Sequence, residues 1–229
     1  MKHITNEWPQ HAAAPNTHNR VLELIGKYLP HPAGLRICDV PCGAGAFSTR
    51  LAQLGADVTP MDIAAVEPFL ADRARRILSN ANQRFPFDDG HFDALVTIEG
   101  IEHLENPSQF LRECARVVKA GSLIFLTTPN VDSFRSRRYL FLKGFHRYFG
   151  PVNDLDKDSG HLHPIDMVFF RGAAQRAGLE ILEVTVNHID KKSWLSELLR
   201  PRLTRKLPHY MQGEAPFYGD VIIYALKRA

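Results

Sequence analysis

Cysteine is scarce in this sequence. Its three cysteines (Cys38, Cys42 and Cys114) show neither a metal-ligand spacing nor the even number of a disulfide framework. This excludes a disulfide-stapled secreted domain and favours a reducing compartment. The sequence also lacks an apolar run of about 18 residues, which excludes an ordinary transmembrane helix, and its start has no signal-peptide pattern. We therefore expect a cytoplasmic protein.

The net charge of the sequence is small and its composition is ordinary. The formal net charge is +3, the hydrophobic content is 45% and the charged content is 23%, which are ordinary values for a globular protein. There is no internal repeat and no low-complexity tract. The small net charge argues against a nucleic-acid partner. At 229 residues the chain is expected to form a single domain, residues 1–229, with a sizeable core. Nothing in the sequence indicates an oligomeric state.

The most informative stretch runs from residue 35 to residue 63. Its apolar runs and small residues predict a buried strand at 35–40, a turn at 41–46, a helix at 47–54 and a second strand at 56–61. Gly55 suits the position just after that helix, where a positive φ is easiest for glycine. Asp62 then stands at the carboxyl end of the second strand. This is the order of elements in a parallel nucleotide-binding unit.

Several residues of this unit suit a ligand. Ligands of open parallel sheets bind beyond the carboxyl ends of the strands. Gly43 and Gly45 lack a Cβ atom, so the backbone can approach a ligand closely. Asp62 is placed to accept hydrogen bonds from ribose hydroxyls. Asp39, at the end of the first strand, suits a cationic or amino-bearing ligand.

The glycine turn is not a dinucleotide fingerprint, because Ser48 stands where the third glycine of G-x-G-x-x-G would be. The run Asp39-Val40-Pro41-Cys42-Gly43-Ala44-Gly45, with Asp62 after it, instead resembles motif I and the following acidic strand end of class I S-adenosylmethionine-dependent methyltransferases. Pro41 stands where this family usually has its first glycine, so the turn must accept a fixed φ and a missing donor. The resemblance implies S-adenosyl-L-methionine as the cofactor.

The remaining segments continue the strand–helix alternation. Periodicity and breakers predict helices at 19–29, 64–74 and 164–177, and strands at 92–98, 123–128, 179–186 and 220–227, with Gly121 ending the connection before 123. Residues 75–79 could extend the preceding helix, but a short strand is favoured. A further helix is predicted from its apolar face, which consists of Phe110, Leu111, Cys114, Val117 and Val118. The pairs Glu102-His103 and Asn106-Pro107, and the run Thr127-Thr128-Pro129-Asn130, are similar to the type 11 and type 23 methyltransferase-like families. The resemblance implies an α/β fold: a Rossmann-like, seven-stranded, mostly parallel sheet with helices on both faces, whose last strand is antiparallel between the fifth and sixth.

The resemblance also implies which residues hold the cofactor. They are the first glycine-turn residues, the acid after the second strand and the residues after the third and fourth strands: Asp39, Pro41, Cys42, Gly43, Gly45, Asp62, Ile63, Asn80, Ala81, Ile98 and Glu99. Many members of the family have an acid near the adenine amino group where this chain has Asn80, whose amide oxygen can still accept a hydrogen bond.

Three histidines are candidate catalytic bases. His103 follows the fourth strand on the ligand side, and His161 and His163 belong to a run that returns toward the same edge. Each of them is equally compatible with a structural role, since His103 can open a helix and His163 precedes Pro164. H-x-H alone is a weak metal pattern, and we predict no metal site.

Residues 131–163 break the strand–helix rhythm. Residues 133–150 hold five basic residues and six aromatic residues without an acid. This segment and the basic, apolar residues 189–213 are predicted to form lid or substrate-binding insertions, while residues 1–34 form an N-terminal arm and helix. A basic aromatic surface suits an acidic or amphiphilic acceptor, or peripheral contact with a membrane. An amphipathic helix with its aromatics in the core explains the pattern as well.

We therefore expect an S-adenosylmethionine-dependent methyltransferase that acts on a small-molecule acceptor, at oxygen. Two alternatives stay open: a methyltransferase of a membrane-associated lipid or quinone precursor, and a protein that binds the cofactor without transferring a methyl group. A dinucleotide oxidoreductase is disfavoured by the missing third glycine.

Overall fold

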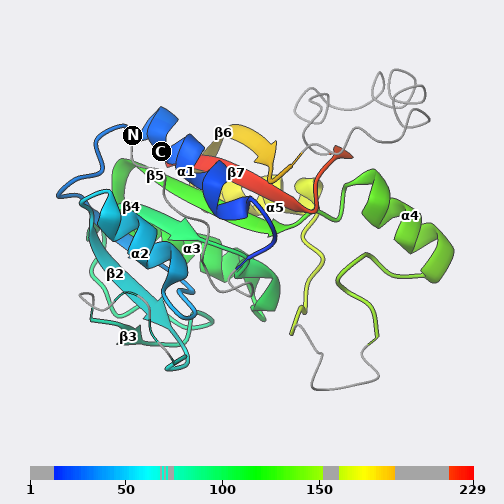
Figure 1. Ribbon diagram of the computed structural model, residues 1–229, viewed down its shortest axis with the longest axis horizontal. Coiled ribbons are helices and arrows are strands. Elements are labelled where there is room, and N and C mark those ends of the chain that lie inside the picture. The colour runs from blue at the N-terminus through cyan, green and yellow to red at the C-terminus, as the bar shows by residue number, and fades with distance from the viewer. Residues whose placement is uncertain (1–12, 68, 70, 72–74, 152–159, 189–216) are drawn as a thin grey trace.

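One seven-stranded sheet organises the protein. The computed structural model describes residues 13–67, 69, 71, 75–151, 160–188 and 217–229 (Figure 1). The strands follow the order β3-β2-β1-β4-β5-β7-β6, and β7 alone runs antiparallel to its neighbours β5 and β6. This confirms the predicted fold class. The strands are β1 (Arg36–Asp39), β2 (Asp57–Asp62), β3 (Ile77–Leu78), β4 (Phe92–Thr97), β5 (Val118–Pro129), β6 (Leu179–Val186) and β7 (Val221–Arg228).

Three of the described helices, α3, α4 and α5, begin where a side chain accepts from a free backbone N–H group. Asn106 accepts from the Gln109 N–H at the start of α3, and Ser133 and Asp166 cap α4 and α5 in the same way. Pro107 occupies the first turn of α3, where its missing N–H costs nothing. The helices are α1 (Thr17–Tyr28), α2 (Ala46–Gln53), the short 3-10 helix η1 (Ile101–His103), α3 (Pro107–Val117), α4 (Phe134–Lys143) and α5 (Met167–Arg176).

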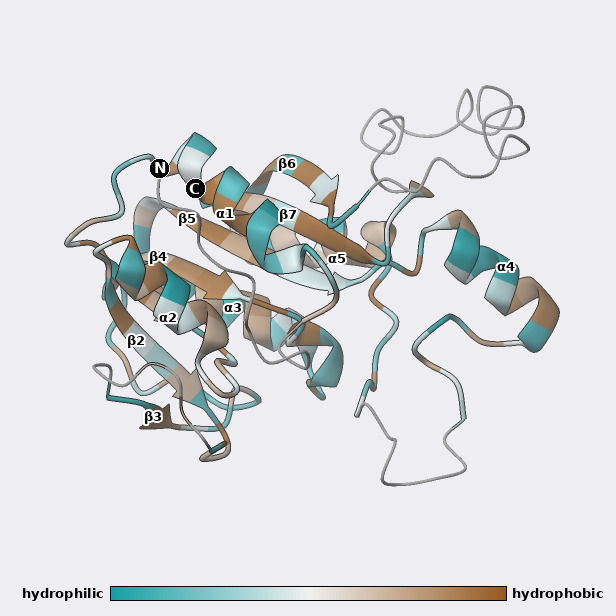
Figure 2. Ribbon diagram, in the orientation of Figure 1, coloured by the Kyte–Doolittle hydropathy of each residue, from teal (hydrophilic) through white to brown (hydrophobic). Residues whose placement is uncertain are grey.

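Alternate residues of the strands supply two separate hydrophobic cores. In β4, Leu95 packs in the core beneath α3 and α5, whereas Ala94 and Val96 pack on the opposite face beneath α1 and α2. This alternation is the period of two of a β-strand whose both faces are buried. Figure 1 shows α1 and α2 on one side of the sheet, and Figure 2 shows the hydrophobic strands between the helices.

The strands direct their carboxyl ends to one edge. There β1 ends at Asp39, β2 at Asp62 and β4 at Thr97. The predicted strand at 75–79 is confirmed in a shorter form as β3, and Gly55 takes the expected positive φ of +84° after α2. The sequence therefore located this edge well.

The predicted helix at 64–74 is wrong over its described residues 64–67, 69 and 71, which form bends and coil. Arg76 explains this, because its guanidinium donates to the Val66 carbonyl at 2.7 Å and to Glu67 at 2.9 Å. Glu67 in turn accepts from the Phe69 N–H at 2.9 Å. These bonds satisfy groups that a helix would have paired internally.

Two predicted boundaries are also wrong. β5 begins at Val118, so Gly121 lies inside the strand rather than ending the connection before it. α5 begins at Met167 rather than at 164, because the Asp166 side chain accepts from the Phe169 N–H at 2.8 Å and caps the helix there. Residues 189–213 lie outside the described residues.

α4 lies within the predicted insertion 131–163 and apart from the two helical layers (Figure 1). Ser136 is its one buried residue. The suggestion that the aromatics of this segment belong to the core is therefore wrong for Tyr139 and Phe141, which are 38% and 87% exposed, whereas Phe134 is half-buried and stacks on the buried Phe217.

Candidate active site

A cavity of about 570 Å³ opens at the carboxyl ends of β1, β2 and β4. Its size suits a nucleotide-sized ligand, since small-molecule sites typically span a few hundred to about 1,000 Å³. The turn after β1, the ends of β2 and β4 and the start of α1 supply its walls. It is lined by His18, Asp39, Val40, Pro41, Cys42, Gly43, Ala44, Ala46, Phe47, Asp62, Ile63, Val66, Asn80, Ala81, Asn82, Ile98, Glu99, Gly100, His103 and Leu104.

Asp39 is a buried carboxylate in the cavity wall. Its Oδ2 accepts from the Ser48 hydroxyl at 2.5 Å, while Oδ1 has no hydrogen-bond partner among the described residues. Burial raises the pKa of Asp39 to about 7, with a smaller contribution from the Asp62 charge and against the Ser48 hydrogen bond. A buried oxygen without a partner is costly. It therefore provides a place for a positively charged, hydrogen-bond-donating ligand group.

Asp62 holds the glycine turn. Its Oδ2 accepts from the Gly43 N–H at 2.8 Å and its Oδ1 accepts from the Ala64 N–H at 3.1 Å. Gly43 has φ +51°, and Gly45 caps α2 with φ +79°. Such backbone conformations favour glycine. The acid thus ties the turn after β1 to the end of β2, and it also lines the cavity.

Pro41 departs from the glycine usual in the family, and a glycine in the loop after the neighbouring strand β4 makes space for it. The Val40–Pro41 bond is cis, and a Cβ atom at Gly100 would overlap the Pro41 ring. Gly100 therefore makes room for proline where the family usually has glycine. Sequence reasoning did not assign this role to Gly100, because the contact joins residues 59 positions apart.

The residues after β3 form the wall beyond Asp62. Asn80 and Ala81 line the cavity as predicted, together with Asn82. The Asn80 Oδ1 accepts from the Asn82 N–H at 2.9 Å, and the Asn82 Oδ1 accepts from the Glu105 N–H at 2.8 Å. This amide chain links β3 to the loop before α3, and it keeps one side of the cavity polar but uncharged.

Glu99 joins the cavity to the chain before α1. It has φ +47°, and its Oε2 accepts from the Ala14 N–H at 3.0 Å. Burial raises the pKa of the Glu99 carboxyl. A non-glycine residue at positive φ is uncommon and marks a position worth functional attention.

His18 of α1 also lines the cavity, with its ring edge-on to Phe47 at 5.0 Å between centroids. Burial, followed by the nearby Arg50 charge, lowers the pKa of His18 to about 4, so the ring is neutral at pH 7. The sequence analysis predicted an N-terminal arm and helix here and did not assign His18 to the site, because no local pattern shows which helix residue reaches a distant strand end.

The three candidate bases occupy different positions. His103 lines the cavity, whereas His161 lies behind it with the two rings 4.7 Å apart at their centroids. His163 is not among the described lining residues; its N–H donates to the Glu102 carbonyl at 3.1 Å. The structure thus brings His103 and His161 together. Of the predicted cofactor residues, all but Gly45 line the cavity, and Gly45 sits behind them at the start of α2.

Glu102, His103 and His161 also bring one ligand-type atom each within 4.8 Å of one another. Glu102 is buried and accepts from the Thr128 hydroxyl at 3.0 Å. Burial, with the Glu99 charge as a smaller cause, raises the pKa of Glu102 to about 8. A metal ion would have to displace the proton of this carboxyl, so any binding by this grouping would depend on pH.

Residues 11–184 match the family model of a methyltransferase domain. The chain is 35% identical over 146 residues to a ubiquinone biosynthesis O-methyltransferase of Xanthomonas axonopodis pv. citri (strain 306), covering 56% of this chain and 58% of that protein. A protein of the same name from Dechloromonas aromatica (strain RCB) is 33% identical over 120 residues, 48% of this chain and 49% of that one. The chain thus spans about half the length of these curated relatives.

Solved structures share the fold. A SAM-dependent methyltransferase from Archaeoglobus fulgidus superposes with a TM-score of 0.62 at 16% identity, over 93% of this chain and 95% of that one. The [4+2]-cyclase SpnF superposes with a TM-score of 0.57 at 18% identity, over 97% and 84%. Since one of these neighbours is named a cyclase, the fold alone does not fix the reaction.

Proposed function

Since the chain belongs to the methyltransferase-domain family, we propose that it transfers a methyl group from S-adenosyl-L-methionine to an oxygen atom of a small-molecule acceptor. The observation that carries the proposal is Asp39, whose unpartnered Oδ1 is buried in a cavity beside the Asp62-held glycine turn. The cofactor has an ammonium group, a sulfonium and ribose hydroxyls, which are the groups that two carboxylates suit.

The residues present fit this cofactor. Asp39 would bind the amino-acid end, the backbone at Gly43 would lie against the ligand, and Asp62 would accept from the ribose. Ile63, Asn80 and Ala81 would border the adenine, and Ile98 and Glu99 would lie across from them. When bound, the cofactor supplies a methyl group on a positively charged sulfur, which leaves as a neutral thioether. The protein's part is to orient the acceptor and exclude water.

His103 is the proposed proton acceptor for the acceptor hydroxyl. It lines the cavity, whereas His163 does not, and a general base contributes roughly 10²–10⁴-fold to such reactions. The names of the two relatives refer to O-methylation, which supports oxygen as the acceptor atom.

The cavity favours an uncharged reacting group. Its described lining holds the acids Asp39, Asp62 and Glu99 and neither lysine nor arginine. The insertion's basic residues serve elsewhere: Arg137 pairs with Asp132, and both Arg135 and Arg147 pair with Asp220. The described lining therefore offers no lysine or arginine to pair with an anionic acceptor group. We therefore infer a neutral hydroxyl as the acceptor, and of the two predicted acceptor types we favour an amphiphile over an acid.

Calorimetric titration tests the proposal directly. Purified protein is titrated with S-adenosylmethionine, S-adenosylhomocysteine and NAD after removal of any co-purified ligand. Binding of the two sulfur compounds without heat from NAD is expected. If neither sulfur compound gives binding heat, the proposal is refuted. A chain that binds them but leaves no methylated product after incubation with cell extract, as judged by mass spectrometry, would instead be a non-catalytic binding protein.

A second candidate is methylation of a membrane-associated amphiphile, and α4 favours it. The last turns of α4 expose Tyr139, Leu140, Phe141 and Leu142 in succession, beside the exposed cations Arg138 and Lys143 (Figure 2). Exposed apolar residues next to cations suit insertion into an anionic membrane surface. Among the described residues, no helix has the length and apolar character needed to cross a bilayer.

Flotation with vesicles tests this candidate. The wild-type chain is expected to float with anionic vesicles and less with zwitterionic ones, and the double variant Phe141→Glu, Leu142→Glu is expected to stay in the soluble fraction. Val168→Glu is the matched control, because Val168 is an equally exposed apolar residue on α5 (63%). Equal flotation of both variants, or none of the wild type, would remove the candidate.

A further inference from the structure

We propose that the main-chain carbonyl of Gly160 fixes the tautomer of His103, so that the insertion between β5 and α5 positions the proton acceptor. The inference rests on the proposed function, because it concerns the histidine assigned there. It makes Gly160 a positioning residue that acts through His103.

The hydrogen bond defines where the ring proton lies. The His103 Nδ1 is 3.1 Å from the Gly160 carbonyl oxygen. A carbonyl oxygen can only accept, so Nδ1 must carry the hydrogen. In the neutral ring the lone pair is then on Nε2. Since the ring also lines the cavity, Nε2 is the nitrogen left to take a proton from a bound acceptor.

The carbonyl is held in place by the backbone that follows it. The N–H groups of Leu162 and His163 both donate to the Glu102 carbonyl, at 2.8 and 3.1 Å. Glu102 immediately precedes His103, so the returning segment is fastened to the same short helix that carries the histidine. Movement of this helix would therefore carry the carbonyl along with the ring.

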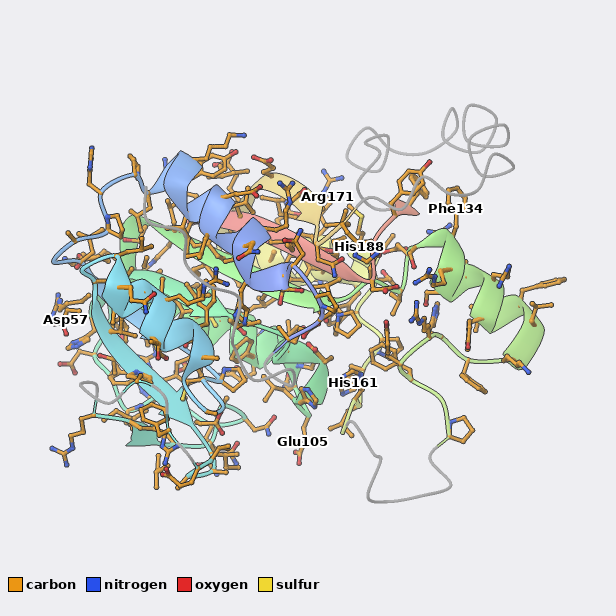
Figure 3. The ribbon with its side chains drawn as sticks, in the orientation of Figure 1. Asp57, Glu105, Phe134, His161, Arg171 and His188 are labelled. Atoms are coloured by element: carbon orange, nitrogen blue, oxygen red, sulfur yellow. The ribbon has the colours of Figure 1, made fainter. Side chains whose placement is uncertain are left out.

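A second contact restricts rotation of the ring. His161 packs against His103 in a T-shaped arrangement, with centroids 4.7 Å apart. His161 is itself oriented, since its Nδ1 lies 3.0 Å from the Tyr148 carbonyl and its ring lies 5.2 Å from that of Phe149. Figure 3 shows His161 on the same side of the molecule as Glu105, which precedes α3.

Position 160 requires glycine for this arrangement. Gly160 has φ +68°, and a Cβ atom there would lie 3.4 Å from the His103 Nδ1. Any other residue would strain the backbone at this φ, and its Cβ atom would contact the bonded nitrogen. Gly160→Ala should therefore move the carbonyl away from Nδ1 while every cavity-lining residue keeps its identity.

The first measurement reads the tautomer without turnover. Long-range ¹H–¹⁵N correlation spectra distinguish the Nδ1–H form of histidine from the Nε2–H form. They are recorded on the full chain with ¹⁵N-labelled histidine, with and without S-adenosylhomocysteine. The signal of His103 is assigned as the one that disappears in His103→Ala. The Nδ1–H form is expected for His103 in the wild type, with the other form populated in Gly160→Ala. A wild-type His103 in the Nε2–H form would overturn the inference.

Kinetics then test the consequence. In Gly160→Ala, kcat should fall about tenfold and the KM for S-adenosylmethionine should not change. This loss of kcat is smaller than the roughly 10²–10⁴-fold loss expected in His103→Ala. Gly178→Ala is the matched control, because Gly178 also has a positive φ (+73°) with open space around it. Equal losses in both glycine variants would overturn the inference. Absence of methyl transfer by the wild type would instead refute the proposed function and leave the tautomer result intact.

Discussion

Asp39→Asn should stabilise the cofactor-free protein, increasingly so as the pH rises. The wild-type carboxyl is buried, and its pKa is raised from 3.8 to about 7. A carboxyl with a raised folded-state pKa binds more protons folded than unfolded, so stability is lost as pH rises from the unfolded to the folded pKa. At about 1.36 kcal/mol per unit, the loss is about 1.6 kcal/mol at pH 5 and about 4 kcal/mol at pH 8.

Asparagine keeps the shape of the side chain and cannot lose a proton, so the variant escapes this loss. Replacing the oxygen that accepts from Ser48 adds a constant offset, but the offset does not depend on pH. The diagnostic quantity is therefore the growth of the stability difference by about 2.5 kcal/mol between pH 5 and pH 8.

Urea unfolding of both chains at pH 5, 6, 7 and 8, without cofactor, measures this difference. Asp57→Asn is the control, since Asp57 is an exposed aspartate at the start of β2. A stability difference that stays constant over this range would mean that Asp39 is already charged in the folded protein, and the reasoning about its burial would fail. At pH 8 the same variant should bind S-adenosylmethionine more weakly, because it lacks the charge proposed to meet the ammonium group.

Three further predictions concern individual side chains. Asp62→Ala removes the acceptor of the Gly43 N–H and should weaken cofactor binding by about 1.5–3 kcal/mol, measured by calorimetry. An unchanged Kd in a folded variant would show that the ribose site is assigned wrongly. Glu113→Ala leaves the buried Phe85 N–H without its acceptor and should lower the free energy of unfolding in urea by about 3 kcal/mol. A decrease below about 1 kcal/mol would show that Glu113 does not stabilise the core in this way. The kcat of His163→Ala should stay within about twofold of the wild-type value, whereas His103→Ala should lose roughly 10²-fold in kcat. Similar losses in the two variants would mean that His103 is not the base.

Local patterns were sufficient for the part of the site that lies within one strand–turn–helix–strand unit. The positions of Asp39, Gly43 and Asp62 around one cavity follow from their place at strand ends, because the ends of adjacent parallel strands meet at one edge whatever the rest of the chain does. The seven-stranded order likewise follows from the alternation of apolar runs together with the family resemblance.

The parts that were missed depend on contacts between distant residues. The helical pattern at 64–74 gave way to the hydrogen bonds of Arg76, which local periodicity does not reveal. His18 enters the cavity because Asn187 and Val186 at the end of β6 hold the start of α1, through Asn16 and Arg20. The bond from His103 to Gly160 spans 57 positions, so only the folded chain shows it.

The place of β7 has a consequence for how the chain is made. β7 lies between β5 and β6, so both of these strands keep an unpaired edge until residues 221–228 have been synthesised. Exposed strand edges are templates for pairing with other chains. During translation at about 5–20 residues per second, β5 waits several seconds for its neighbour. Until then the nascent polypeptide presents those edges to other chains, so its risk of intermolecular pairing is highest before its last residues emerge.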